Sequence, residues 1–273
     1  TQVFAGTMGD DIFNGSDTSS EPDRKEFFLP FQGSDEVYGN GGHDILHYDT
    51  GSWHDGIEVD FAKGTASHVA KFSGIEEVRG SPGDDTVTAE GYDLDIKVQG
   101  GDGDDTITGG TGDDTIYGDD GDDILTGGDG DDEIYAGAGN DIVYASFGSD
   151  YEDGGDGIDT FIIDEVLDYI PAIDLQKKAA YLYGKEPTQE NIINFENIEI
   201  LSSSDFVLIG DEKANVLKGG SGEDTIDGGD GNDTIKGGSG IDKLIGGSGD
   251  DIIDGGDDED ALDYSSSTSK ISL

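Results

Sequence analysis

The chain has 273 residues, with 64 acidic and 14 basic side chains, a formal net charge of −50 and no cysteine. This charge excludes a nucleic-acid partner, because an acidic surface repels phosphate, and the lack of cysteine excludes disulfides. No stretch is long and apolar enough to predict a membrane span.

The amino-terminal part, residues 1–49, predicts a short block of turns and strands. Two nine-residue units, G-T-M-G-D-D-I-F-N and G-N-G-G-H-D-I-L-H, are complete. A third opens at Gly15 and resumes at Gly33, so residues 18–32 are predicted to be a loop inserted inside one turn. The apolar end of this loop, residues 27–31, is predicted to fold back over the block or to meet a partner.

Residues 50–79 lack the nine-residue pattern and are predicted to be a connector. A main block follows over residues 80–162, in which seven units run without a break from Gly100 to Ile162. The first of the seven reads G-G-D-G-D-D-T-I-T: glycine or a small polar residue fills the opening positions, aspartate the sixth and an aliphatic residue the eighth. Three-residue strands with the middle side chain inward predict a core one aliphatic residue deep.

A second connector, residues 163–209, resembles the first. Ile173-Asp174-Leu175 matches Val59-Asp60-Phe61, and each triplet precedes an apolar segment that contains glutamate. Within this connector, residues 174–184 are predicted to be a helix that caps the edge of a block. They begin with a capping aspartate, contain two alanines and two lysines, and end at a glycine.

Six further units form a second block over residues 210–263, and residues 264–273 are predicted to start a third connector. Asp263-Tyr264 echoes Tyr48-Asp49, which precedes the first connector. The chain is therefore expected to be a piece of a longer array, in which neighbouring repeats of the same chain are its partners.

The sixth position of the units is the candidate metal ligand. Oxygen ligands without histidine or cysteine favour calcium over zinc or copper, and glycine allows the strained turns that point carbonyls at an ion. The candidates are Asp11, Asp35, Asp44, Asp85, Asp105, Asp114, Asp123, Asp132, Asp141, Asp150, Asp159, Asn215, Asp224, Asp233, Asp242, Asp251 and Asp260. The sites at Asp150 and Asn215, near the ends of the runs, are predicted to be weaker than those in the middle.

The pattern resembles the repeats-in-toxin (RTX, hemolysin-type) calcium-binding nonapeptide of bacterial proteins exported by type I secretion. The resemblance implies an all-β fold of parallel β-roll, or β-solenoid, blocks in which repeat n stacks on repeat n+2. It also implies that calcium lies between stacked turns, held by the sixth-position side chain and by turn carbonyls. Under that rule seven repeats give five stacked pairs and six give four, which predicts about nine or more calcium ions.

These features predict a calcium-folded structural module of a large extracellular protein, secreted or attached to the cell surface, of the adhesin, surface-layer or toxin type. Motifs of zinc proteases, serine hydrolases and P-loop enzymes are missing, so we expect no enzyme activity. The alternative is a polysaccharide-binding accessory module of an exported enzyme. In that case the candidates for stacking on a polysaccharide or cell-surface glycan are Tyr48, Trp53 and His54 with Tyr117, Tyr135 and Tyr144.

Overall fold

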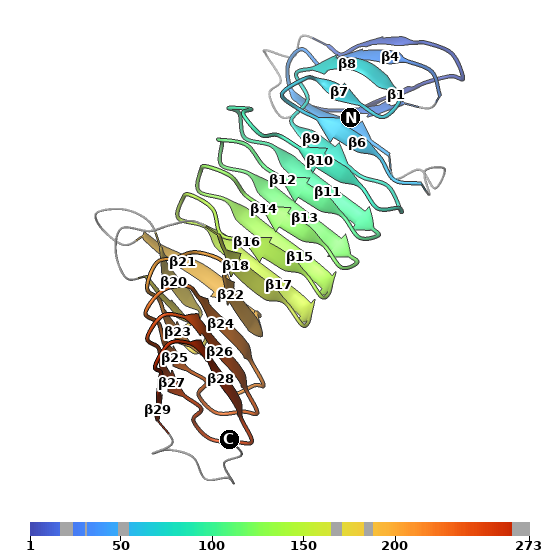
Figure 1. Cartoon of the computed structure of the whole chain (residues 1–273). Helices are drawn as coiled ribbons and strands as arrows, with labels where there is room; N and C mark the ends of the chain where they lie inside the picture. Colours follow the sequence, from blue (N-terminus) through green and yellow to red (C-terminus); the bar gives the residue numbers. More distant parts are fainter. Residues whose placement is uncertain (17–23, 31, 49–54, 165–170, 183–187, 264–273) are drawn as a thin grey trace. The chain divides into compact units, whose positions relative to one another are not determined.

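The computed structural model describes residues 1–16, 24–30, 32–48, 55–164, 171–182 and 188–263. These residues form two compact units, Thr1–Ala138 and Gly139–Leu273. They contain strands and turns but no helix, and hence no helix long and apolar enough to cross a membrane. Within each unit, successive coils stack as rungs and each coil gives one strand to each of two sheets (Figure 1). The predicted all-β parallel β-roll is confirmed.

The first unit has two sheets that are parallel except at the connector. One contains, in spatial order, β1 (Gln2–Ala5), β3 (Lys25–Leu29), β5 (His43–His47), β9 (Glu77–Arg79), β11 (Lys97–Asp102), β13 (Thr115–Asp120) and β15 (Glu133–Gly139). The other contains β2 (Ile12–Asn14), β4 (Asp35–Tyr38), β8 (Val69–Ser73), β7 (Thr65–Ala66), β6 (Glu58–Asp60), β10 (Thr86–Thr88), β12 (Thr106–Thr108) and β14 (Ile124–Thr126).

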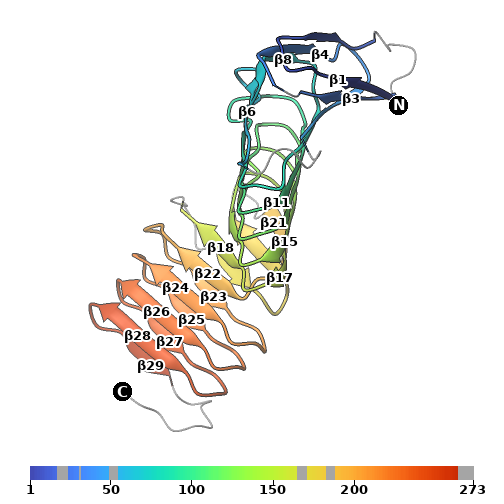
Figure 2. The same ribbon diagram turned by 90° about the vertical axis from the view of Figure 1, so that its right-hand side faces the viewer.

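The second unit repeats this plan. One sheet contains β17 (Tyr151–Gly157), β21 (Thr188–Ile193), β20 (Ala179–Leu182), β19 (Ala172–Asp174), β23 (Val207–Ile209), β25 (Thr225–Asp227), β27 (Lys243–Ile245) and β29 (Ala261–Asp263). The other contains β16 (Ile142–Tyr144), β18 (Thr160–Ile163), β22 (Asn197–Ile200), β24 (Val216–Gly220), β26 (Thr234–Ser239) and β28 (Ile252–Asp257). Figure 2 shows the strands β22 to β29 of this unit as a regular series.

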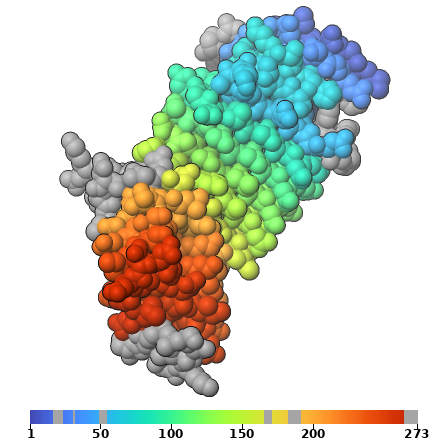
Figure 3. All heavy atoms as spheres, in the orientation of Figure 1, coloured from blue at the N-terminus to red at the C-terminus, as the bar shows by residue number. Residues whose placement is uncertain are grey.

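The register of the strands confirms that each repeat stacks on the second repeat after it. Ile226 pairs with Leu244 and Ile235 with Ile253, each 18 residues further along the chain. Sequential coils therefore cross the surface of each unit as successive bands of colour in Figure 3. Every coil contains the nine-residue repeat twice, so equivalent turn residues recur along both edges of the stack.

The eighth residue of each repeat forms the core, as the pattern predicted. These side chains are fully buried at Ile107, Ile116, Leu125, Ile134, Val143, Phe161, Leu217, Ile226, Ile235 and Leu244. Towards the end of the second unit the core opens, and Leu262 is 37% exposed. Glu152 is fully buried at the same position, where every other repeat has an apolar residue. The core is one side chain deep, so apolar burial alone provides few contacts per coil.

The predicted inserted loop at residues 18–32 is wrong in part, because Lys25–Leu29 forms strand β3 in the middle of a sheet. Phe28 is fully buried, stacks on Phe4 with ring centroids 4.9 Å apart and meets the edge of Phe13. Burial of these aromatic rings explains why the segment joins the sheet instead of leaving it. Residues 17–23 and Phe31 lie outside the described part.

The predicted helix at residues 174–184 is also wrong. Asp174 ends β19, a turn follows and Ala179–Leu182 forms β20, which pairs antiparallel with β19. Asp174 Oδ1 accepts the Lys177 N–H (2.9 Å), and Lys178 has a left-handed φ of 57° that a helix does not contain. Residues 183 and 184 lie outside the described part. An isolated helix of this length is marginal, and pairing with the sheet outweighs its propensity.

The two connectors have the same structure. In the first, β6, β7 and β8 form an antiparallel meander inserted into a parallel sheet, and in the second β19, β20 and β21 do the same. Asp60 accepts the Lys63 N–H (2.8 Å) as Asp174 accepts that of Lys177, and Gly64 has the φ of 63° that matches Lys178. The sequence likeness between the connectors therefore reflects a shared fold.

Candidate metal centre

Each repeat places its sixth residue at the end of the turn that joins the two sheets or, for Asp35 and Asp44, at the start of the next strand. These residues form a column along each edge of a unit. In the first unit one column contains Asp11, Asp35, Asp85, Asp105 and Asp123, and the other contains Asp44, Asp114 and Asp132. In the second unit one column contains Asp141, Asp159, Asn215, Asp233 and Asp251, and the other contains Asp150, Asp224, Asp242 and Asp260. All are buried except Asp11, Asp251 and Asp260, which are half-buried.

In most repeats one carboxylate oxygen of the sixth residue accepts a backbone N–H of the coil before it. Asp233 Oδ1 accepts the N–H of Asn215 at 2.9 Å, and Asp251 Oδ1 accepts that of Asp233 at 3.1 Å. The same bond joins Asp11 to Asp35, Asp85 to Asp105, Asp105 to Asp123, Asp114 to Asp132, Asp141 to Asp159, Asp224 to Asp242 and Asp242 to Asp260. This bond fixes the orientation of the carboxylate.

In several sixth residues the other oxygen is left without a hydrogen bond, whereas Oδ2 of Asp85 and Asp114 accepts a backbone N–H of its own turn. Oδ2 of Asp105, Asp224, Asp233 and Asp242 has no hydrogen-bond partner, although each of these residues is 1% exposed. A buried carboxylate oxygen without a partner costs several kcal/mol. Each such turn therefore requires a proton or a cation at this oxygen.

In most repeats the first residue is a glycine, which leaves space beside that oxygen. A Cβ placed on Gly228 would lie 2.5 Å from Asp233 Oδ2 and 2.5 Å from the carbonyl oxygen of Gly246, in the next coil of the same edge. A carboxylate oxygen and a carbonyl oxygen thus converge on a space that a Cβ on Gly228 would occupy. The same pair of oxygens surrounds the first glycines Gly80, Gly100, Gly109, Gly118, Gly219 and Gly237.

Burial changes the ionisation of these carboxyl groups. It raises the pKa of Asp105 to about 8 and that of Asp224 to about 7, and neighbouring carboxylates of the same column raise both further. Burial likewise raises the pKa of Asp233 and Asp159 to about 6. Without a cation, the folded turn therefore favours the protonated acid.

Calcium fits this set of donors. It prefers hard oxygen ligands and accepts carboxylates and backbone carbonyls in flexible geometry, whereas zinc and copper prefer nitrogen or sulfur. Each turn offers one carboxylate with converging carbonyl oxygens. In the part of the chain that the structure describes, no three histidine, aspartate or glutamate side chains gather as a metal-binding cluster. The ligand set that the turns present is thus mainly backbone, ordered by one side chain.

The raised pKa values predict how the metal-free protein responds to pH. A carboxyl group whose pKa is higher in the folded state than its ordinary value of 3.8 binds more protons when folded. Its contribution to folding is present at low pH and is lost as pH rises from about 4 to about 8. We expect protein stripped of metal to contain more β-structure at pH 5 than at pH 8 by far-ultraviolet circular dichroism. More β-structure at pH 8 would contradict the burial of these groups.

The fifth residues form a second ladder that the sequence analysis missed. Asp104 Oδ1 accepts the N–H of Asp122 at 2.9 Å, and Asp113 Oδ1 accepts that of Asp131 at 3.0 Å. These bonds run to the following coil, opposite to those of the sixth residues. The recurrent D-D or N-D pair in the sequence is the signal of this arrangement, since one acid of the pair binds each neighbour.

One turn departs from the rule at the start of the second block. Lys213 Nζ forms an ion pair with Glu196. The Asn215 side chain donates to the Glu196 carbonyl oxygen at 2.9 Å. An ammonium and an amide thus replace part of the negative charge that other turns present. This arrangement agrees with the predicted weaker site at Asn215, which stays a prediction.

The structure places the tyrosines proposed for sugar stacking in different settings. Tyr48 is fully buried and donates to the Ser67 carbonyl oxygen at 2.8 Å. Tyr117 and Tyr135 stack face to face with centroids 5.0 Å apart, and the Lys97 ammonium lies 4.7 Å from the centre of the Tyr117 ring. Tyr144 lies in β16 of the second unit, and Trp53 and His54 lie outside the described part.

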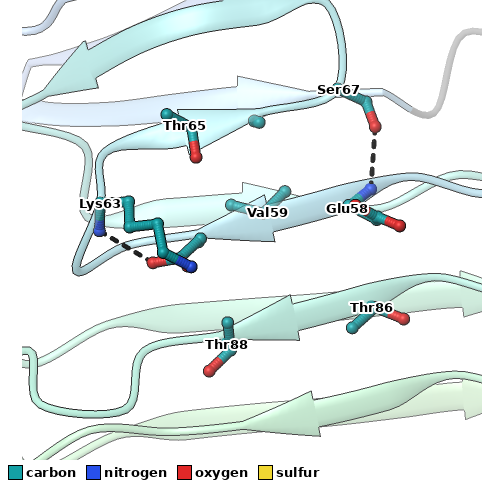
Figure 4. Close-up of a pocket in the computed structure, with 9 residues that line it drawn as sticks. Glu58, Val59, Lys63, Thr65, Ser67, Thr86 and Thr88 are labelled. Atoms are coloured by element: carbon teal, nitrogen blue, oxygen red, sulfur yellow. Dashed lines mark hydrogen bonds and ion pairs between the residues drawn. The ribbon is translucent and has the colours of Figure 1, made fainter.

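A separate hollow of about 320 Å³ lies beside the first connector. Thr65 of β7 and Thr86 and Thr88 of β10 line it, and β6 runs between these strands (Figure 4). Three charged residues line it, and two of them, Asp60 and Lys63, pair with each other, while the third is Glu58. None of the predicted ligands lines this hollow.

Comparison with known families agrees with the geometry of the turns. The profile of the RTX calcium-binding nonapeptide repeat (4 copies) matches residues 32–52, 99–134, 126–161, 207–235 and 236–266. These matches together cover just over half of the chain. A search among curated proteins finds no match.

Proposed function

Because the chain belongs to the RTX calcium-binding nonapeptide repeat family, we propose that it is a calcium-folded structural module of a large secreted or cell-surface protein. Its role is to form a stiff β-roll once calcium is bound, as a part of an adhesin, surface-layer or toxin-type protein. Neighbouring repeats of a longer chain are its partners, and it has no catalytic activity of its own.

The observation that carries this proposal is the buried, unpartnered carboxylate oxygen in turns of both long runs, at Asp105, Asp224, Asp233 and Asp242. Asp233 Oδ2 is buried and has no hydrogen bond, and a carbonyl oxygen points at the same space beside Gly228. A calcium ion in this space supplies the positive charge that compensates the buried carboxylate, and it links two coils. About nine or more such ions follow from the stacked pairs of the two long runs.

Charge and core size make calcium part of the fold. A net charge of −50 strongly opposes compaction, and the core is one side chain deep. Metal binding that occurs only in the folded state adds directly to folding free energy. Extracellular calcium modules bind at roughly 10⁻⁴–10⁻³ M, so the module stays unfolded where calcium is scarce and folds outside the cell.

Limited proteolysis tests this proposal. Chymotrypsin cleaves beside Tyr and Phe, which number 11 each, and several of them lie in the repeats. We expect the chain to resist cleavage at 5 mM calcium and to be cut within the main block, at residues such as Tyr117, Tyr135 and Phe161, in metal-free buffer, because an open coil exposes these sites. Magnesium at the same concentration is the control. Equal resistance with and without calcium would contradict a calcium-dependent fold.

A further inference from the structure

Both connectors return to the roll through the same three-residue turn. Gly74, Ile75 and Glu76 form it in the first unit, with Gly74 at a left-handed φ of 64°. In the second unit it consists of Asn194, Phe195 and Glu196, with Asn194 at 60°. Ile75 is 1% exposed and Phe195 3%, so the middle residue anchors the turn in the core. The six-residue turn of the repeat is thus replaced by a shorter one that ends in glutamate.

The glutamate takes the place of the sixth-position aspartate. Residue 76 is in register with Asp44, because Ile45 pairs with Glu77, and residue 196 is in register with Asp159, because Thr160 pairs with Asn197. Glu76 Oε2 accepts the Asp44 N–H at 2.8 Å, and Glu196 Oε2 accepts the Asp159 N–H at 3.1 Å. Sixth-position aspartates make the same bond to the preceding coil elsewhere. Because the connector turn is shorter, the extra methylene of glutamate is what lets the carboxylate reach this N–H.

The aspartates that face these turns are buried and unpartnered. Asp44 is 0% exposed and neither of its carboxylate oxygens has a hydrogen-bond partner. Asp159 is 0% exposed and its Oδ2 has none. Each of them therefore presents a buried carboxylate oxygen whose negative charge is not stabilised by a hydrogen bond.

The connectors also supply the converging carbonyl oxygen. A Cβ placed on Gly39 would lie 1.8 Å from the Gly74 carbonyl oxygen and 2.5 Å from Asp44 Oδ2. At Gly154 the corresponding distances are 2.6 Å to the Asn194 carbonyl oxygen and 2.9 Å to Asp159 Oδ2. This is the arrangement found between two regular repeats, with the left-handed residue of the connector as carbonyl donor.

We propose that each connector turn completes a calcium site with the repeat before it. One site contains Asp44, Glu76 and the Gly74 carbonyl, and the other contains Asp159, Glu196 and the Asn194 carbonyl. This inference rests on the proposed calcium-binding function and adds sites that the nine-residue pattern does not contain. The connectors are then bound to the blocks by calcium as well as by strand pairing.

The two sites differ in charge. Glu196 pairs with the Lys213 ammonium, so the second site already holds a positive charge beside its glutamate. At the first site the carboxylates of Glu76 and Glu26 lie near Asp44, and the Arg24 guanidinium pairs with Glu26 at 3.2 Å. Because Lys213 pairs with Glu196 itself, its ammonium competes directly with the ion at the second site.

Native mass spectrometry of the full chain tests this, because it resolves single calcium ions on 28.6 kDa. In Glu76→Gln and Glu196→Gln the glutamine keeps an oxygen for the backbone N–H but removes the charge. We expect each variant to bind one calcium fewer than the unaltered chain, and the double variant two fewer. Glu58→Gln, an exposed change in the first connector, is the matched control and is expected to bind the full number.

Lys213→Met provides a test that does not depend on loss of folding. It removes the competing ammonium, so the second site is expected to fill at a calcium concentration about tenfold lower, or roughly 1.4 kcal/mol tighter. An unaltered chain that binds no calcium would overturn the proposed function itself. An unaltered chain that binds calcium, with unchanged numbers in Glu76→Gln and Glu196→Gln and no gain in Lys213→Met, would overturn the connector sites alone.

Discussion

Replacement of Asp233 by alanine is expected to remove one calcium ion and to raise the calcium concentration for half-folding about threefold. The side chain binds the Asn215 N–H with one oxygen and faces the space beside Gly228 with the other. Loss of such a buried charged group costs about 3 kcal/mol. Shared over roughly four ions that bind together in the second block, this loss gives about a threefold change in midpoint.

Asp230→Ala is the matched control for this experiment. It removes the same side chain three residues earlier in the same repeat, where Asp230 is exposed and Asp233 is buried. Calcium titrations followed by circular dichroism should show an unchanged midpoint for Asp230→Ala. If the two variants had the same midpoint, the assignment of the sixth position as ligand would be wrong.

Replacement of Ile226 by alanine is expected to destabilise the second unit by about 3 kcal/mol at saturating calcium, within the range for such core truncations. Ile226 is fully buried and stacks in register between Leu208 and Leu244 of the neighbouring coils. Because the core is one residue deep, no second layer can close over the cavity. Urea unfolding at fixed calcium measures the loss.

Ile241→Ala is the control for the core prediction. It makes the same truncation at the fifth position of a repeat in the same unit, where Ile241 is 57% exposed. Its effect on the free energy of unfolding is expected to stay within about 0.5 kcal/mol. A comparable loss for both variants would mean that the eighth position does not form the core of the coil.

The sequence predicts the repeats well because their fold is periodic. Each repeat contains its own turn glycine, ligand and core residue, so Asp233, Gly228 and Ile235 could be assigned from spacing alone. The stacking of repeat n on repeat n+2 came from the family resemblance, and the register of β25 and β27 confirms it. Local pattern and tertiary structure agree wherever the repeat is intact.

The connectors could not be predicted in the same way. The helix expected at residues 174–184 fits local propensity, but strand pairing with β23 and burial of Ala179 and Ala180 decide the structure. Glu76 and Glu196 were not recognised as counterparts of sixth-position aspartates. Each follows the first residue of its turn, Gly74 or Asn194, by two positions, whereas the sixth residue of a repeat follows the first by five. Only the register of neighbouring strands shows the equivalence.

β3 was missed for a related reason. Glu26 lies in register with Asp44, and its Oε2 lies 2.6 Å from the place of a Cβ on Gly15. It thus stands where a sixth-position aspartate would, 11 residues after its glycine instead of five. An insertion between the two halves of a repeat hides this match from any analysis of fixed spacing.

Far-ultraviolet circular dichroism during a calcium titration at neutral pH, with magnesium as the control, tests the central claim most directly. The calcium-bound turns predict a cooperative change from coil to β-structure at close to millimolar calcium, and no such change with magnesium. A chain that already has its full β-structure in metal-free buffer at neutral pH would contradict the claim that calcium is required for this fold.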